Sequence, residues 1–363
     1  MVYSGCCVRG LACGTPRPCG PPSVNQQHAL DSPQHMQHFR GEIVDIYSLI
    51  DRLIRPGQSE QQVCERLSAT KFIATSDWQA LKRHEQEFLR CYAVGAASRR
   101  AVLIGRSAAA IHSIWTLPDN DAPVYLAHPK PASPKRWPPG VRYTGMCIPE
   151  MDTIAFTPTG TTDKLRVTSP VRTAVDIARF HGVRHGVVAM DSLFHKMQKP
   201  WEQQQMREDL EATIRRMERK RGINKARQAL EWSSTWSESP YESLFRVILR
   251  ECGIVVQEQM WIGKHVRPDF VWGQLVAEID GAVKFDEDPK RAALEQLQRE
   301  NWIRSQLYEV LRITVPELLR DEAACVRRLL EIKARSELLG EPLTKATRER
   351  PRSGEHWRYQ PSA

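Results

Sequence analysis

The clearest pattern of apolar and polar positions begins at residues 237–253, which read SESPYESLFRVILRECG. Ser239 is a suitable N-cap, Pro240 suits the first helical position, and Gly253 suits the position after the last turn. The apolar residues between them recur at the spacing of one buried helix face; they are Tyr241, Leu244, Phe245, Ile248 and Leu249. The pattern therefore predicts a helix that starts at Pro240 and stops before Gly253.

Downstream of this helix, the pattern changes to short apolar runs that are typical of strands. The predicted elements are, in order, strands at about 254–262, 266–272 and 275–280, a helix at about 288–306, a strand at 308–314 and a helix at 316–338. This order predicts an α/β domain, of the α+β kind, over residues 237–338. Residues 339–363 are basic and polar, and we expect a flexible tail there.

The start of the chain predicts a disordered leader over residues 1–38, followed by helices. Between Ile43 and Leu67, two helices are expected around Pro56-Gly57, and Ser59 is a plausible cap of the second. This pattern fits a DNA-binding helix-turn-helix, but it also fits an ordinary helical hairpin.

The next segments predict a mainly helical N-terminal domain with short strands over residues 39–195. A long helix is followed by VLIGRSAAAIHSI, in which a short strand leads into a helix of small residues. A proline-rich stretch with short strands follows, and then LRVTSPVRTAVDIARF, which predicts a strand, an N-cap at Ser169 and a helix. His112 and Asp176 fall on these helices, and we interpret both as structural residues.

Residues 196–236 are predicted to form a basic helical connector. Between residues 215 and 227 only Glu218 is acidic, and the basic residues are Arg215, Arg216, Arg219, Lys220, Arg221, Lys225 and Arg227. Such a run is either a solvated helix face or a surface that follows nucleic-acid phosphates. The sequence leaves both interpretations open.

Composition adds a preference for polyanionic partners. The 363 residues carry a formal net charge of +9, which favours association with nucleic acid. The 9 cysteines lack the C-x-x-C pairs of a zinc site, and their scatter beyond the leader is typical of reduced thiols. No apolar run approaches the roughly 20 residues of a membrane span, and no export signal is evident. We therefore expect a cytoplasmic protein without a membrane partner.

The stretch HVRPDFVWGQLVAEIDGAVKF, at residues 265–285, places three carboxylates in strand-like sequence. If Gly273-Gln274 forms a two-residue hairpin loop, Asp269 lies opposite Glu278, at about 5 Å on one face. Asp280 lies two residues beyond Glu278 and therefore faces the same side. The hairpin thus predicts three converging carboxylates.

These carboxylates repel one another, so a positive charge must offset them. One candidate is Arg267, which the same register places opposite Asp280. The other is a divalent cation, Mg²⁺ or Mn²⁺, which carboxylate oxygens can hold and which can activate water against a phosphodiester. Lys284 could then stabilise charge on the phosphate. Glu242 is either the N3 residue of a capping box with Ser239 or a fourth acid of the site.

An acid on a helix, then P-D, then E-x-D after a hairpin resembles the PD-(D/E)XK nuclease superfamily, and within it the very-short-patch-repair-like endonucleases. SESPYES, PDF, EIDGAVKF and RENWIRSQLYEVLRI are similar to the motifs of a group of actinobacterial proteins. The N-terminal half of those proteins is similar to AbiEi-type antitoxins and winged-helix regulators, which VLIGRSAAAIHSI and VTSPVRTAVDIAR resemble.

The resemblance implies a restriction-endonuclease-like mixed sheet flanked by helices, preceded by an AbiEi-like or winged-helix-like domain. It implies nucleic acid, most readily DNA, as the partner and Mg²⁺ as the cofactor. It carries Glu242, Asp269, Glu278 and Asp280 over as metal-site acids, with Asp269, Glu278 and Asp280 as the metal ligands, and it gives catalytic roles to Glu242 and to Lys284 as the motif lysine. The superfamily's usual lysine, two residues after the motif acid, is Asp280 here, so Lys284 is the lysine left for that role.

Three hypotheses remain open from the sequence. The first is a metal-dependent DNA endonuclease, which the intact acids favour. The second is a DNA-binding transcriptional regulator or antitoxin whose nuclease-like domain is inactive, which the displaced lysine favours. The third is an α/β protein with a salt-bridged hairpin and no nucleic-acid partner.

Overall fold

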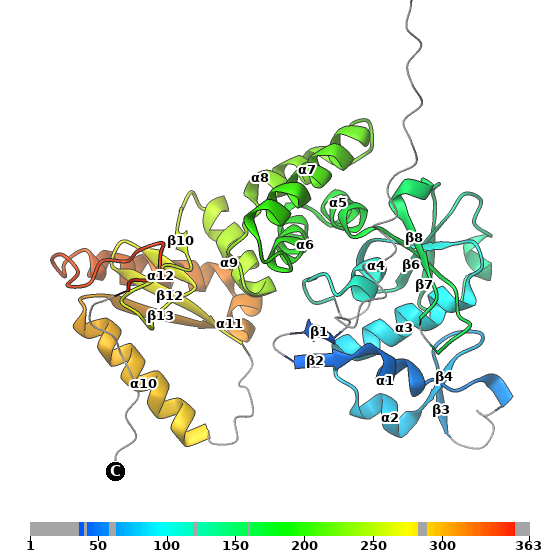
Figure 1. The fold of residues 1–363 in the computed structure, drawn as a ribbon, viewed down its shortest axis with the longest axis horizontal. Coiled ribbons are helices and arrows are strands. Elements are labelled where there is room, and N and C mark those ends of the chain that lie inside the picture. The colour runs from blue at the N-terminus through cyan, green and yellow to red at the C-terminus, as the bar shows by residue number, and fades with distance from the viewer. Residues whose placement is uncertain are drawn as a thin grey trace, which may run out of the picture.

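The computed structural model describes residues 36–39, 42–57, 63–119, 122–158, 160–281 and 289–352 of the chain. Within these ranges the fold is mixed α/β, as expected, with a five-stranded sheet in the N-terminal half and a four-stranded sheet in the C-terminal half. The two sheets lie toward opposite ends of the long axis, with a group of helices between them (Figure 1). None of the helices in these ranges has the length and apolar content that a membrane crossing needs.

The five-stranded sheet has the order β7-β6-β5-β9-β8. The pairs β6–β7 and β5–β9 are parallel, and the other pairs are antiparallel. The strands are β5 (Val102–Leu103), β6 (Val124–His128), β7 (Val141–Gly145), β8 (Thr153–Phe156) and β9 (Leu165–Thr168). Helices α3 (Arg83–Ala97) and α4 (Gly105–His112) share a core with this sheet that includes Leu89, Leu103, Leu126 and Val167. The short strands and the small-residue helix α4 are confirmed.

The start of the described chain differs from the prediction. Strand β1 (Met36–Phe39) pairs with β2 (Glu42–Asp45), where the end of a disordered leader was expected. Helix α1 (Ile46–Asp51) agrees with the first predicted helix. The end of the second predicted helix is instead strand β3 (Cys64–Arg66), paired with β4 (Phe72–Ala74).

This correction has a tertiary cause. Pairing of β3 with β4 satisfies the backbone of a short segment and buries Ile73 completely, which the local pattern around residues 64–66 does not reveal. Ser59, the expected cap, lies outside the described residues. Helix α2 (Thr75–Ala80) then leads to α3.

The middle of the molecule is a layer of four helices: α5 (Pro170–His181), α6 (Val183–His195), α7 (Pro200–Arg216) and α8 (Ile223–Trp232). Ser169 caps α5 as predicted, accepting a hydrogen bond from the Arg172 N–H. Helices α5 and α6 meet closely at Gly186, where a Cβ would lie 2.4 Å from the Cβ of Ala178. Residues 196–236 were expected to be a connector, but α7 and α8 contribute to one hydrophobic core with α5 and α6.

The C-terminal half begins with α9 (Pro240–Glu251), capped by Ser239 as predicted. Its sheet has the order β10-β11-β12-β13, in which the last pair is parallel and the others are antiparallel. The strands are β10 (Gln257–Glu258), β11 (Phe270–Trp272), β12 (Leu275–Asp280) and β13 (Glu309–Thr314). The helices are α10 (Pro289–Ser305), α11 (Val315–Arg320) and α12 (Glu322–Ser336). A mixed sheet flanked by helices is therefore confirmed.

Alternation along β12 divides its side chains between two cores. Leu275 and Ala277 pack into a cluster with residues of α9, α11 and α12. Val276 packs on the opposite face, in a cluster that includes Val271, Val310 and Ile303. Because side chains alternate along a strand, Glu278 and Asp280 continue the face of Val276.

Part of the expected tail lies against this domain. Thr347 forms a backbone bridge with Trp261, the Tyr308 hydroxyl donates to the Thr344 carbonyl at 2.9 Å, and the Arg350 Nε donates to the Lys264 carbonyl at 2.8 Å. The expectation of a flexible tail from residue 339 therefore does not describe this segment. Residues 353–363 lie outside the described residues.

Candidate active site

The predicted hairpin and its register are confirmed. Phe270 pairs with Ala277 and Trp272 with Leu275, and Gly273 opens the loop with a φ of +61°, which favours glycine. Asp269 directly precedes the paired segment, and its carboxylate Oδ2 accepts a hydrogen bond from the Ile279 N–H at 2.8 Å. The Asp269 side chain therefore lies across the hairpin, against β12.

The three predicted carboxylates line one open pocket of about 400 Å³. Asp269, Glu278 and Asp280 enter it from the hairpin, while Arg299 enters from α10 and Arg312 from β13. We refer to this group as the Asp269–Glu278 pocket. The convergence that the hairpin register predicts is therefore observed.

Two arginines neutralise part of this pocket. In the parallel pair β12–β13, Arg312 is the direct partner of Glu278. The Arg312 guanidinium bonds Glu278 Oε2 at 2.6 Å and Asp280 Oδ1 at 2.7 Å, and Arg299 Nη2 lies 2.6 Å from Glu278 Oε1. Both oxygens of Glu278 are thus paired with arginine.

The neutralising role was predicted for the wrong arginine. Arg267 was expected opposite Asp280; it lines the same pocket, but its ion pair is with Glu238 and it lies over the Trp261 ring. The ladder ends at Phe270, so Arg267 is not held in the register of β12. Arg299 and Arg312 were missed as partners, although both fall within the stretch RENWIRSQLYEVLRI.

Glu242 has the contacts of a capping residue at the start of α9, while its role as a fourth acid of the site stays a prediction, because it is not among the residues that line the pocket. Its N–H donates to the Ser239 hydroxyl at 3.1 Å, and its carboxylate accepts from the Glu238 N–H at 2.9 Å and from Gln259 Nε2 at 3.2 Å. Burial raises the pKa of Glu242 to about 8, and the negative charge of Asp269 adds to this shift. Glu242 therefore caps the start of α9 and is electrostatically linked to Asp269.

The pKa of Asp269 is also raised, to about 6. Burial is the main cause, and the charge of Glu278 adds to it, while the hydrogen bond from Ile279 acts in the opposite direction. Within the described ranges, neither Asp269 nor Glu242 has an ion pair with Lys, Arg or His. Buried Glu242 and partly buried Asp269 are therefore where a positive charge would be most favourable.

Lys284 lies outside the described residues, so its predicted role stays a prediction. Within the described part of the chain, no group of three His, Cys, Asp or Glu side chains is arranged to hold a metal ion. Of the three predicted carboxylates in the Asp269–Glu278 pocket, Asp269 thus has no basic partner among the described residues, and Glu278 and Asp280 are bound by arginine.

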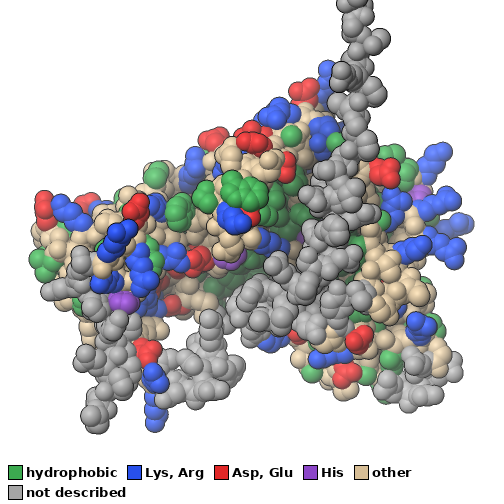
Figure 2. All heavy atoms as spheres, in the orientation of Figure 1, with side chains coloured by type: hydrophobic (Ala, Val, Ile, Leu, Met, Phe, Trp, Pro, Cys, Tyr) green, Lys and Arg blue, Asp and Glu red, His purple; other side chains and the backbone are tan. Residues whose placement is uncertain are grey.

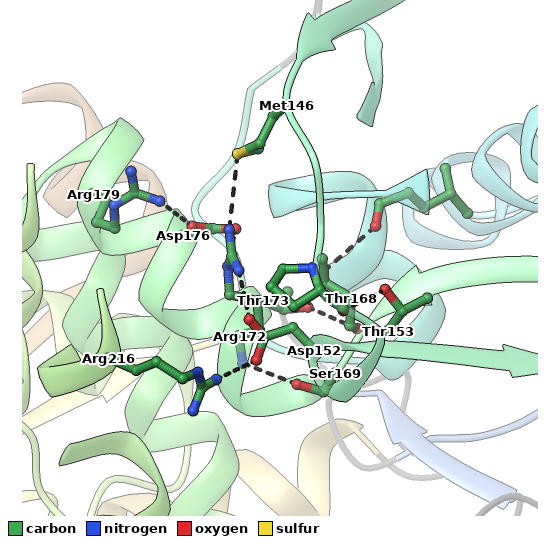
Figure 3. Close-up of polar contacts among 12 residues, drawn as sticks. Met146, Asp152, Thr153, Thr168, Ser169, Arg172, Thr173, Asp176, Arg179 and Arg216 are labelled. Carbon is green, nitrogen blue, oxygen red and sulfur yellow. Dashed lines mark hydrogen bonds and ion pairs between the residues drawn. The ribbon is translucent and has the colours of Figure 1, made fainter. Parts of the chain in front are cut away.

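A second cluster of buried charges lies in the N-terminal half and is fully paired (Figure 3). Arg172 bonds Asp152 Oδ2 and Asp176 Oδ2, each at 2.7 Å. Arg216 and Arg179 pair with the remaining oxygens of Asp152 and Asp176. This Asp152–Asp176 cluster agrees with the structural role expected of Asp176.

His112 has the structural role expected of it as well. The ring is buried on α4 and its Nε2 lies 2.7 Å from the Thr168 carbonyl. Burial lowers the pKa of His112 to about 4, so the ring is neutral at physiological pH.

The predicted basic run extends from the end of α7 into α8. Arg216 is held in the Asp152–Asp176 cluster, Arg215 lies 3.5 Å from Glu211, and Arg227 donates to Asn224 at 2.7 Å. The other four side chains are exposed: Arg219, Lys220, Arg221 and Lys225. The run is therefore not a uniform surface of free cations.

Comparison of the chain with family models, curated proteins and solved structures gives no match. Function must therefore be argued from the residues of the two halves and from their geometry.

Proposed function

We propose that this chain acts on DNA and hydrolyses phosphodiester bonds with a divalent cation, Mg²⁺ or Mn²⁺, held in the Asp269–Glu278 pocket. The single observation that carries the proposal is the convergence of Asp269, Glu278 and Asp280 on one pocket, with Glu242 close enough to Asp269 for their charges to interact. Acids placed together in this way destabilise a fold unless they have a use or a counter-charge.

The residues fit a divalent cation in part. Partly buried Asp269 and buried Glu242 have raised pKa values and no basic partner among the described residues, and hard cations prefer such oxygen ligands. Glu278 would join them by exchanging an arginine contact. A bound Mg²⁺ would supply Lewis-acid activation of water and of the phosphate.

The chain's own residues would do the remaining work. Arg299 and Arg312 carry guanidinium groups that suit phosphate oxygens, so each could bind the DNA backbone while releasing a carboxylate. Asp280 would hold Arg312 in position, and Glu242, when ionised, would add a second negative charge that attracts a cation toward Asp269. Lys284, if it reaches the pocket, would stabilise charge on the phosphate.

A second candidate is a DNA-binding transcriptional regulator or antitoxin whose nuclease-like domain does not cleave. The observation that favours it is that Arg299 and Arg312 both pair with Glu278, and that Arg312 also pairs with Asp280. Two of the three predicted metal ligands are therefore already bound by arginine. In that case the arginines are permanent structural partners rather than exchangeable ones.

A plasmid-nicking assay with Mg²⁺ or Mn²⁺ separates the two candidates. We expect wild-type protein to nick supercoiled DNA, and the double substitution Asp269→Asn, Glu278→Gln to reduce the rate about a hundredfold or more. The matched control is Glu295→Gln, which removes an acid from the pocket wall on α10 but not from the hairpin. Binding without nicking in wild type would move the function to the second candidate.

A further inference from the structure

The N-terminal half carries a strongly basic surface that lies outside the predicted basic run. Residues 122–149 contain no Asp or Glu, and their basic side chains include Lys130, Lys135, Arg136 and Arg142. All four are exposed. In Figure 2, Lys and Arg side chains gather at the right-hand edge of the molecule, over the part of Figure 1 that carries β6 and β7.

The fold presents these cations from a stiff connection at the edge of the five-stranded sheet. Strands β6 and β7 are parallel neighbours, and β7 is the edge strand. The proline-rich crossover between them is fixed by the Trp137 Nε1–H, which donates to the Ala132 carbonyl at 2.8 Å, and by contact of the Trp137 and Tyr143 rings at 5.8 Å. Proline removes backbone freedom, so little entropy is lost when the surface binds a ligand.

These four cations have no counter-charge among the residues that the structure describes. None of the four side chains makes an ion pair or a hydrogen bond within the ranges that the structure describes. The run at residues 215–227 differs, because Arg215, Arg216 and Arg227 already have protein partners there. Unpaired surface cations without nearby acids keep their full attraction for a polyanion.

We propose that this surface, named here the β6–β7 surface and formed by Lys130, Lys135, Arg136 and Arg142, binds the phosphate backbone of duplex DNA. The choice of DNA as partner rests on the proposed function. The surface lies at the end of the molecule away from the sheet that carries the Asp269–Glu278 pocket (Figure 1). It therefore acts as an anchor that is separate from the pocket and raises the local concentration of DNA by a second point of attachment.

The test measures binding of a short DNA duplex by the full chain as a function of salt. All proteins carry Asp269→Asn and Glu278→Gln, so that the duplex is not cut. The variant combines Lys130→Ala, Lys135→Ala, Arg136→Ala and Arg142→Ala. The control combines Arg52→Ala, Arg320→Ala, Arg327→Ala and Arg335→Ala, which removes the same charge from exposed positions outside both the surface and the run at residues 215–227.

We expect the variant to bind at least about tenfold more weakly than its parent at low salt. The slope of log Kobs against log[salt] should fall by about 0.9 for each phosphate that the variant no longer neutralises. The control should keep its parent's slope. Equal weakening in variant and control would show a net-charge effect and overturn the proposal, and so would an unchanged variant. Circular dichroism and Tm confirm that both are folded.

Failure here can be told apart from failure of the proposed function, because binding and nicking are separate readouts. If DNA binding depends on the β6–β7 surface but the wild type does not nick DNA, the proposal for this surface stands and the proposed nuclease function fails. If the wild type nicks DNA but the variant binds DNA as its parent does, the proposed nuclease function stands and the proposal for the β6–β7 surface fails.

Discussion

The two clusters of buried charge differ in how completely each is paired. In the Asp152–Asp176 cluster all four carboxylate oxygens have an arginine partner, and Asp152, Asp176 and Arg172 are at most 5% exposed. In the Asp269–Glu278 pocket, Asp269 has no basic partner among the described residues, and Arg312 is 20% exposed.

This difference separates a structural cluster from a candidate reactive one. A closed, fully paired cluster holds helices and loops in place and leaves no charge available for a ligand. The pocket instead opens to solvent. Asp269, which lines it, and Glu242 nearby both have raised pKa values, so each carboxyl group is closer to the pH at which it gains or loses a proton. The comparison predicts that losing an arginine costs less stability in the pocket than in the paired cluster, and that added cations stabilise through the pocket alone.

The largest effect is expected at the centre of the paired cluster. Arg172→Ala leaves Asp152 and Asp176 buried without their shared partner, so we expect a loss of about 3–5 kcal/mol in the free energy of unfolding. Urea denaturation followed by circular dichroism measures it. A loss below about 1 kcal/mol would mean that water replaces the guanidinium easily and that the cluster is not closed.

A smaller effect is expected for the arginine of the pocket. Arg312→Ala should cost about 1–2 kcal/mol without metal, because Arg312 is partly solvated and Glu278 keeps Arg299. The substitution also frees Asp280 and one oxygen of Glu278, so added Mn²⁺ should raise Tm more in the variant than in wild type.

The control for this cation effect is Arg172→Lys, which should leave the Mn²⁺-dependent rise in Tm unchanged. If Mn²⁺ stabilises neither wild type nor Arg312→Ala, the arginines are permanent partners of the acids. The pocket would then belong with the paired cluster, and the regulator would become the better proposal.

A third prediction uses the pKa of Glu242. The pKa of Glu242 is about 8 in the folded state and 4.5 ordinarily. At a pH between 4.5 and 8, the folded state therefore holds a proton on Glu242 that the unfolded state has lost. Stability from this group is therefore present at low pH and is lost as pH rises toward 8. Glu242→Gln should reduce the loss of stability between pH 7 and 8 by up to about 1 kcal/mol, measured in urea without divalent cations.

Above pH 7, the buried histidines do not contribute to the pH dependence of stability, to which they add with the opposite sign to Glu242. Burial lowers the pKa of His112 and of His185 to about 4, so their contribution is lost as pH falls below 6.5. An identical slope for wild type and Glu242→Gln between pH 7 and 8 would show that Glu242 is ionised in the fold. It would then resemble the acids of the paired cluster.

The pocket shows which parts of a site a sequence can reveal. The convergence of Asp269, Glu278 and Asp280 could be predicted because a two-residue loop fixes register over the next few residues. The pairing of Arg312 with Glu278 could not, because it depends on a parallel strand 34 residues further along the chain. Nothing local sets the register of such a crossover connection.

The N-terminal half also shows that local features can be predicted from the sequence and that contacts between distant segments cannot. The cap at Ser169 and the helix after it were predictable, because both are local. The strand at residues 64–66 was not, because pairing with β4 and burial of Ile73 decided it. The partners of Asp152 also come from distant segments, since Arg216 lies 64 residues away.

The smallest effect is expected at the edge of the paired cluster. Arg216 is 35% exposed and shares Asp152 with Arg172, so Arg216→Ala should cost less than about 1 kcal/mol in the free energy of unfolding. It should also leave the salt dependence of DNA binding unchanged, because its guanidinium is bound to Asp152 rather than free for phosphate. A reduced salt slope in this variant would show that Arg216 exchanges Asp152 for DNA. The paired cluster would then not be closed, and the distinction between the two clusters would fail at this residue.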